Sequence, residues 1–210
     1  MLPNTAVLEV LERAYAPCEA LRGACSEMRW APRAGRVPRG FTGAFGELAE
    51  VKLVLVMAEP GDPHLSEAYP DTAAPREILE SACRYAYSAL DRGADLFHRN
   101  LRHILDLCWP DSSLVEQLHH SWLTDSVLCS AIREGAPVPG VSARECRTRY
   151  LDAQLDLFPG ATVVALGGKA QQRLRGRRDV LHAFAVAPPG CNRREAWPSW
   201  ESIAARFRNT

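Results

Sequence analysis

The segment VKLVLVMAEPGDPH, which runs from Val51 to His64, decides the fold class of this chain. Its first seven residues, Val51–Met57, are apolar except for Lys52, which is typical of a strand buried on both faces of a sheet. Glu59–Asp71 then holds four prolines or glycines and is predicted to be a loop. Because ligands bind beyond the carboxyl ends of strands in an open parallel sheet, the polar residues after Met57 are candidates for a site.

The rest of the chain alternates predicted helices with predicted strands. A helical region over Arg76–Leu107, broken near Gly93, precedes the other strand candidates, and a helix over Ser142–Phe158 lies among them. This alternation predicts an α/β fold with three layers, α/β/α, around a central, mainly parallel sheet of four to five strands. The length of 210 residues predicts one domain, with an N-terminal helix and basic loop over 1–46 and an α/β core over 47–210. The further strand candidates are Leu123–Leu128, Ala161–Leu166 and Ala183–Ala187.

Composition excludes some classes of function and leaves others open. Twenty-five Lys and Arg balance 25 Asp and Glu, so net charge makes no overall case for nucleic-acid binding. No stretch approaches the ~20 apolar residues that cross a bilayer, and Met1–Ala20 lacks the basic start and apolar run of a signal peptide. We therefore expect a cytoplasmic monomer without a membrane partner. Its seven cysteines are then better read as free thiols or metal ligands than as a disulfide framework.

Three segments in a fixed order carry a resemblance to a known family. They are Val51–His64, WLTDSVLC at Trp122–Cys129, and CRTRYLDAQLDLFPGATVVALGGKA at Cys146–Ala170. Together they resemble the core of the uracil-DNA glycosylase superfamily, and the pattern is nearest to its iron–sulfur, family-4-like branches. The resemblance implies a uracil-DNA glycosylase-like fold, DNA as partner, and hydrolysis of the bond between a flipped base and its sugar.

The loop after the first strand is the predicted catalytic segment. By the resemblance, Glu59 stands where the family-1 enzymes carry their catalytic aspartate, and Pro60 and Gly61 follow it beside the base. The glutamate of the iron–sulfur branches falls on Ala58, so the carboxylate is displaced by one residue in this chain. Breaking a glycosidic bond develops positive charge on the sugar, and one carboxylate can stabilise that charge and orient the attacking water. Asp62 and His64 are predicted to assist. The alternative is that Glu59 caps or ion-pairs a surface loop.

The base-reading position departs from the family pattern. Asp125 stands where the resemblance places an asparagine whose amide matches uracil O4 and N3. A neutral aspartic acid would instead accept from cytosine N4 and donate to N3, and an apolar pocket favours that neutral form. The alternative is that Asp125 caps the following turn. Tyr69 lies close to the sequence position where the resemblance places an aromatic residue that stacks on the flipped base, an interaction worth ~1–3 kcal/mol per base. The alternative is that Tyr69 is a core or surface tyrosine.

The last loop departs from the family as well. Ala187 occupies the position of the family's histidine, which stabilises the departing base. Asn192 or Arg193 is predicted to replace it by donating to the base O2 or to phosphate. Arg194 and Lys169 complete the predicted DNA contacts, and the loop is a candidate wedge for base flipping. The alternative is a rigid proline turn with an exposed basic tip.

Four cysteines are candidate ligands of a [4Fe–4S] cluster. Cys129 and Cys146 stand where the iron–sulfur branches carry two ligands, and Cys18 and Cys25 are the candidates for the other two. The N-terminal pair has the spacing C-x6-C, whereas the family usually has C-x2-C. Zinc on the same thiolates and free thiols without a metal are the alternatives.

The sequence therefore predicts a DNA glycosylase that removes a flipped pyrimidine, uracil or a related lesion, in base-excision repair. One alternative is a glycosylase for cytosine or modified cytosine that acts in anti-phage defence. The other is a catalytically silent DNA-binding protein, because the usual histidine is missing.

Overall fold

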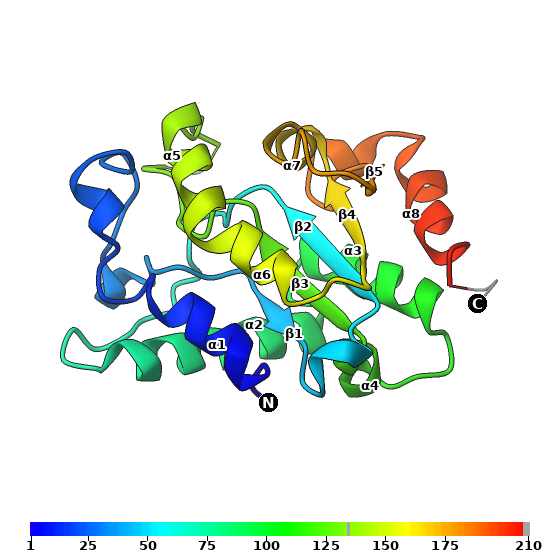
Figure 1. Ribbon diagram of the computed structural model, residues 1–210, viewed down its shortest axis with the longest axis horizontal. Helices are drawn as coiled ribbons and strands as arrows, with labels where there is room; N and C mark the ends of the chain where they lie inside the picture. The colour runs from blue at the N-terminus through cyan, green and yellow to red at the C-terminus, as the bar shows by residue number, and fades with distance from the viewer. Residues whose placement is uncertain (134, 208–210) are drawn as a thin grey trace.

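A five-stranded sheet forms the centre of the molecule. The computed structural model describes residues 1–133 and 135–207. The strand order is β1-β3-β2-β4-β5, in which β3, β2, β4 and β5 run parallel and the two-residue β1 pairs antiparallel with β3. Helices cover both faces, as Figure 1 shows, with α6 in front of the sheet and α3 behind it. The strands are β1 Thr42–Gly43, β2 Leu53–Met57, β3 Ser121–Asp125, β4 Thr162–Leu166 and β5 Val180–Ala183.

Alternation along the central strand β2 divides the core into two layers. Val54 and Val56 pack into the cluster that includes residues of α1, α5, α6 and the first half of α2. Leu53, Leu55 and Met57 pack into the cluster that includes residues of α3, α4 and α8. Because both faces are buried, the strand is a continuous apolar run. The helices are α1 Thr5–Glu12, α2 Pro75–Arg92, α3 Leu96–Cys108, α4 Leu114–His119, α5 Gly140–Cys146, α6 Asp152–Asp156, α7 Gly168–Arg173 and α8 Ala196–Ala204.

Local sequence signals separate α2 from α3. Pro75 opens α2, and the Glu77 carboxylate accepts a hydrogen bond from the Ala74 N–H at 2.9 Å. Gly93 ends the helix in the left-handed conformation, with φ of 57°. The Asp95 carboxylate then accepts from the His98 N–H at 3.0 Å and caps α3. The predicted break near Gly93 is therefore confirmed.

The structure confirms the α/β class with helices on both faces and corrects three details. The sheet is mixed rather than mainly parallel, because β1 in the predicted basic loop adds an antiparallel edge. The last strand is Val180–Ala183 rather than Ala183–Ala187, so Ala187 lies in the following loop. The helix predicted over Ser142–Phe158 begins at Gly140 and is interrupted by a π-helical turn, Arg147–Leu151, between α5 and α6.

None of the helices within residues 1–133 and 135–207 combines the length and the apolar character that a bilayer crossing requires.

Candidate functional site

The ends of β2 and β3 bring two predicted site residues to one edge of the sheet. Met57 pairs with Asp125 in the parallel register. Backbone bonds continue the pairing beyond the strands, from Ser126 N–H to Met57 O at 2.9 Å and from Val127 N–H to Ala58 O at 3.1 Å. Glu59 therefore begins its loop beside the strand that carries Asp125, as parallel strand ends require.

Two cations from α7 hold the Glu59 carboxylate. Lys169 Nζ donates to Glu59 Oε1, and Arg173 Nη1 lies 2.6 Å from Oε2. The side chain of Glu59 is 11% exposed and that of Arg173 is 10% exposed, so this ion pair is largely shielded from water. Lys169, predicted to contact DNA, is half exposed and lies within the site itself.

Arg173 is a site residue that sequence reasoning missed. Besides Glu59, its guanidinium donates to Ala58 O at 2.7 Å and to Ser126 Oγ at 3.1 Å. The Ser126 hydroxyl donates in turn to Ala58 O at 2.7 Å, which ties the loops after β2 and β3 together. The sequence signal that could have identified Arg173 is its spacing from Lys169, because residues four apart share one face of a helix.

Asp125 lies in a different environment from Glu59. It is 3% exposed, and none of the described residues donates a hydrogen bond to its carboxyl group. Burial raises the pKa of Asp125 well above its ordinary value, and the nearby charge of Glu59 raises it further. Gly40, at φ of 87°, packs against the carboxyl group so closely that a Cβ there would overlap Oδ2. Pro60 lies beside the same glycine, within 4 Å of that Cβ position.

The buried side chain of Arg39 holds the loop after Glu59 in place. Arg39 Nη2 donates to Gly61 O and to Ser130 Oγ, the latter at 2.9 Å, and Arg39 Nε lies 3.5 Å from Glu67 Oε1. Burial is the main cause that raises the pKa of Glu67 above its ordinary value. The Tyr69 hydroxyl donates to Glu67 Oε1 at 3.0 Å, and its ring is buried in the core. Stacking of Tyr69 on a base would require that ring to be uncovered.

The remaining predicted site residues either contact other side chains or are exposed. Asp62 forms an ion pair with Arg36 at 2.8 Å, and the exposed His64 ring lies 2.8 Å from Ser66 Oγ through Nδ1. Asn192, Arg193 and Arg194 are exposed in the loop between β5 and α8.

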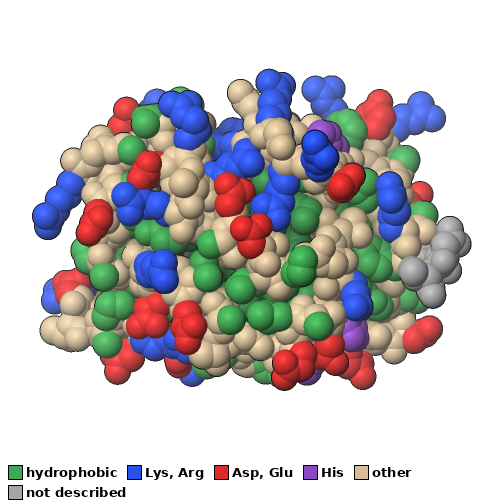
Figure 2. Space-filling model, viewed as in Figure 1, with side chains coloured by type: hydrophobic (Ala, Val, Ile, Leu, Met, Phe, Trp, Pro, Cys, Tyr) green, Lys and Arg blue, Asp and Glu red, His purple; other side chains and the backbone are tan. Residues whose placement is uncertain are grey.

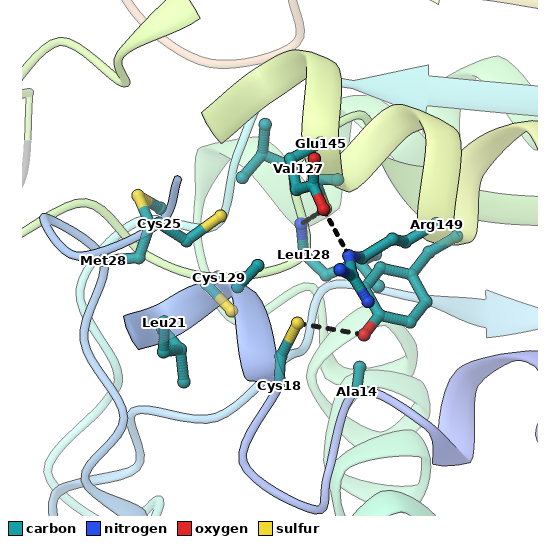
Figure 3. A pocket seen from close by; sticks show the side chains of 13 residues that line it. Ala14, Cys18, Leu21, Cys25, Met28, Val127, Leu128, Cys129, Glu145 and Arg149 are labelled. Atoms are coloured by element: carbon teal, nitrogen blue, oxygen red, sulfur yellow. Dashed lines mark hydrogen bonds and ion pairs between the residues drawn. The ribbon is translucent and has the colours of Figure 1, made fainter. Parts of the chain in front are cut away.

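The four candidate cysteine ligands line one small cavity. Cys18, Cys25, Cys129 and Cys146 surround a space of about 20 Å³, and Figure 3 shows the first three of these side chains around it. Burial raises the pKa of the Cys146 thiol to about 12 and also raises that of Cys129, to which the other three thiols contribute. Among the described residues, no three His, Cys, Asp or Glu side chains stand close enough together to hold a metal ion as they are placed.

Charge is distributed unevenly on a molecule with no net charge. Figure 2 shows Lys and Arg gathered along the upper edge, around α5 and α7, and Asp and Glu more frequent along the lower edge. The arrowheads of β2 and β4 point toward that upper edge in Figure 1. The edge that carries Glu59 and Asp125 is therefore the basic side of this face.

No protein-family model matches the chain, and none of the curated proteins does. The arrangement itself offers two carboxyl groups with opposite surroundings, one held by cations and one buried without a donor. Pairs of this kind are how active sites keep one carboxylate ionised and one carboxylic acid neutral.

Proposed function

We propose that this chain is a DNA glycosylase that hydrolyses the N-glycosidic bond of a flipped pyrimidine. The observation that carries the proposal is the pair at adjacent strand ends: Glu59 ion-paired with Lys169 and Arg173, and Asp125 buried. The resemblance of the three sequence segments supports the same assignment. In this proposal the enzyme acts in the cytoplasm on uracil or a related lesion, as in base-excision repair.

Glu59 is the proposed catalytic residue. As the bond to the base breaks, the sugar becomes positively charged, and an ionised carboxylate beside it stabilises that charge and orients water for attack. Lys169 and Arg173 form ion pairs with Glu59 and hold its carboxylate in a fixed position. The departing base takes its negative charge toward the loop after β5, where exposed Asn192 and Arg193 supply donors in place of the family's histidine.

A specific observation favours cytosine or a modified cytosine as the second candidate substrate. The raised pKa of Asp125 favours the protonated carboxyl group, which donates through its hydroxyl and accepts through its carbonyl oxygen. Cytosine offers the matching acceptor at N3 and donor at N4, whereas uracil offers a donor at N3 and an acceptor at O4. A glycosylase with this preference fits a role in defence against phages with modified cytosine.

The test is an incision assay on matched oligonucleotides. Strands with a single uracil, cytosine, hydroxymethylcytosine or glucosylated hydroxymethylcytosine are incubated with protein, and abasic sites are cleaved with alkali. Wild-type protein is expected to cut at one of these bases, and Glu59→Gln is expected to lose the activity. Glu201→Gln, which changes an exposed glutamate on α8, is the matched control and should cut like wild type.

Asp125→Asn separates the two substrate candidates. An amide matches uracil, so this variant should gain activity on uracil and lose it on cytosine derivatives if Asp125 reads the base. Incision by wild type at uracil alone would contradict the cytosine assignment. A wild-type protein that binds these strands without cutting any, with affinity indifferent to Glu59→Gln, would instead be the catalytically silent DNA-binding protein.

We also propose that the four-cysteine cavity holds a [4Fe–4S] cluster. The donor set fits: four thiols from three separate segments of the chain surround one apolar space. A single zinc ion needs its thiolates about 2.3 Å from one centre, and the described cysteines are not placed closely enough for that, which disfavours zinc. The cluster would link the N-terminal segment to the loop after β3, next to Ser130 and Arg39. Iron and sulfide analysis of anaerobically purified protein, with Cys129→Ala and with Cys83→Ala as control, tests this assignment.

A further inference from the structure

Tyr150 is placed to act on the four-cysteine cavity although it is not one of the predicted ligands. Its hydroxyl donates a hydrogen bond to Cys18 Sγ at 3.0 Å, which is drawn as a dashed line in Figure 3. The only other acceptor within reach in the described part of the chain is Arg13 O, at 3.4 Å. A phenol keeps its proton at neutral pH, so the sulfur receives this bond whether it is a thiol or a thiolate.

A second donor is preformed on another of the four sulfurs. The Leu128 N–H donates to Cys146 Sγ at 3.4 Å. Tyr150 therefore supplies the side-chain member of a set of two donors, each aimed at a sulfur that lines the same cavity. Such donors around ligand sulfurs stabilise negative charge on them and set the reduction potential of a bound cluster.

The position of Tyr150 is fixed by its own helix. Tyr150 belongs to the π-helical turn Arg147–Leu151, which directly follows Cys146, and wider turns of this kind are frequent at functional sites. Gln154, fully buried, donates to Tyr150 O at 3.2 Å and accepts from Thr124 Oγ1 on β3 at 2.8 Å. The hydroxyl is thus held against Cys18 by a segment that is anchored to the sheet.

We infer that Tyr150 is a positioning residue for the cluster ligand Cys18, holding its sulfur and raising the reduction potential of the iron–sulfur group through the O–H···S bond. This inference rests on the proposed cluster and names the residue that tunes it. A purely structural tyrosine would contribute its ring to packing and nothing through its hydroxyl, so removal of the oxygen atom alone distinguishes the two roles.

The experiment compares wild type with Tyr150→Phe, purified anaerobically, by potentiometric titration of the visible absorbance of the cluster. Tyr150→Phe keeps the ring and is expected to move the midpoint potential to a more negative value. It is also expected to release iron to a chelator several-fold faster. The matched control is Tyr15→Phe, which removes the hydroxyl of another buried tyrosine that donates to the Pro38 carbonyl rather than to sulfur. The control should keep the wild-type potential, and thermal denaturation of each variant verifies that it folds.

The possible results separate this inference from the cluster proposal. A folded Tyr150→Phe that loses its iron during purification, while Tyr15→Phe keeps it, supports the same role for the hydroxyl. Iron in the wild type, together with an unchanged potential and unchanged iron release in Tyr150→Phe, would overturn the inference and leave the cluster in place. Equal shifts in Tyr150→Phe and Tyr15→Phe would also overturn it. Wild-type protein without iron would overturn both the cluster and the inference.

Discussion

At the scale of single residues, Asp125 and Glu59 differ in what surrounds them rather than in their chemistry. Glu59 faces two cations, whereas Asp125 has no donor among the described residues and has the charge of Glu59 nearby. Burial removes water from both carboxyl groups, and only one of them is compensated by ion pairs. This difference makes the two positions separately testable, one through stability and one through rate.

The raised pKa of Asp125 predicts a pH-dependent gain in stability for Asp125→Asn. Between the unfolded pKa of about 3.9 and the higher folded pKa, the folded protein binds more protons than the unfolded chain. Wild-type stability therefore falls as pH rises through that window, while asparagine does not titrate. In acid, the variant should have the same free energy of unfolding as wild type. At neutral pH, its free energy of unfolding should be higher by about 1.4 kcal/mol for each pH unit that separates the folded pKa from the unfolded one. Urea denaturation at several pH values, with exposed Asp111→Asn as control, measures this; a difference independent of pH would contradict it.

Arg173→Gln should slow the proposed glycosylase. The guanidinium 2.6 Å from Glu59 Oε2 holds that carboxylate in a site that is largely shielded from water. Loss of this charged hydrogen bond predicts a fall in kcat/KM of about 10- to 100-fold at neutral pH. Arg173→Lys, which keeps the charge, should retain more of the activity. Arg175→Gln on the same segment is the control, and an unchanged kcat/KM in Arg173→Gln would show that Arg173 does not position Glu59 for the reaction.

At the scale of elements, the pattern of apolar runs predicts the four parallel strands, two of them, β2 and β4, within two residues of their bounds. The strand predicted over Leu123–Leu128 is Ser121–Asp125, so it begins two residues earlier and ends three residues earlier than predicted. Those runs have a local cause, because burial on both faces demands them. The two-residue β1 is too short to show such an apolar run. No local pattern indicates that Arg39 is buried, because it lies in a segment rich in arginine, glycine and proline. Its burial depends on Glu67, Ser130 and Gly61, which are distant in sequence. Contacts of that kind arise only when the sheet brings the loops together.

The link between α6 and β3 gives a prediction at this scale. Gln154 Oε1 accepts from Trp122 Nε1 at 3.1 Å and from Thr124 Oγ1 at 2.8 Å, all three side chains being buried. Gln154→Leu would leave both donors unpaired, so the free energy of unfolding should fall by about 2–4 kcal/mol. Chemical denaturation measures the change, with exposed Gln172→Leu as the control. A loss below about 0.5 kcal/mol would mean that water or another group satisfies the two donors.

At the scale of the whole molecule, the cysteine cavity and the carboxyl pair are neighbours along one edge. The segment after β3 contains Ser126, which binds the Arg173 guanidinium, and Cys129, which lines the cavity. Ser130 follows directly and accepts from Arg39, which also holds Gly61 in the loop after Glu59. A cluster in that cavity would stiffen the segment that carries both sets of contacts. The proposed cofactor thus has a place in the architecture of the site without taking part in hydrolysis.

The uneven charge of the surface predicts salt-sensitive binding of DNA at the edge where β2 and β4 end. Net charge is zero, so attraction to phosphate must come from the basic side seen in Figure 2 and from the exposed loop after β5. Each phosphate contact contributes about one to the slope of log K against log salt concentration. The double variant Arg193→Ala, Arg194→Ala should therefore bind an abasic-site oligonucleotide more weakly and reduce that slope by about two.

The matched control takes two arginines from α2, Arg84→Ala with Arg92→Ala, which leaves the net charge equal to that of the test variant. Fluorescence anisotropy over a series of salt concentrations gives both slopes. If the control loses as much affinity and slope as the test variant, attraction depends on overall charge rather than on the loop after β5. If neither variant changes the slope, DNA does not approach this edge. A loss confined to the Arg193 and Arg194 variant would set the loop beside Glu59 and Asp125 on the DNA backbone, which a base flipped toward these carboxyl groups requires.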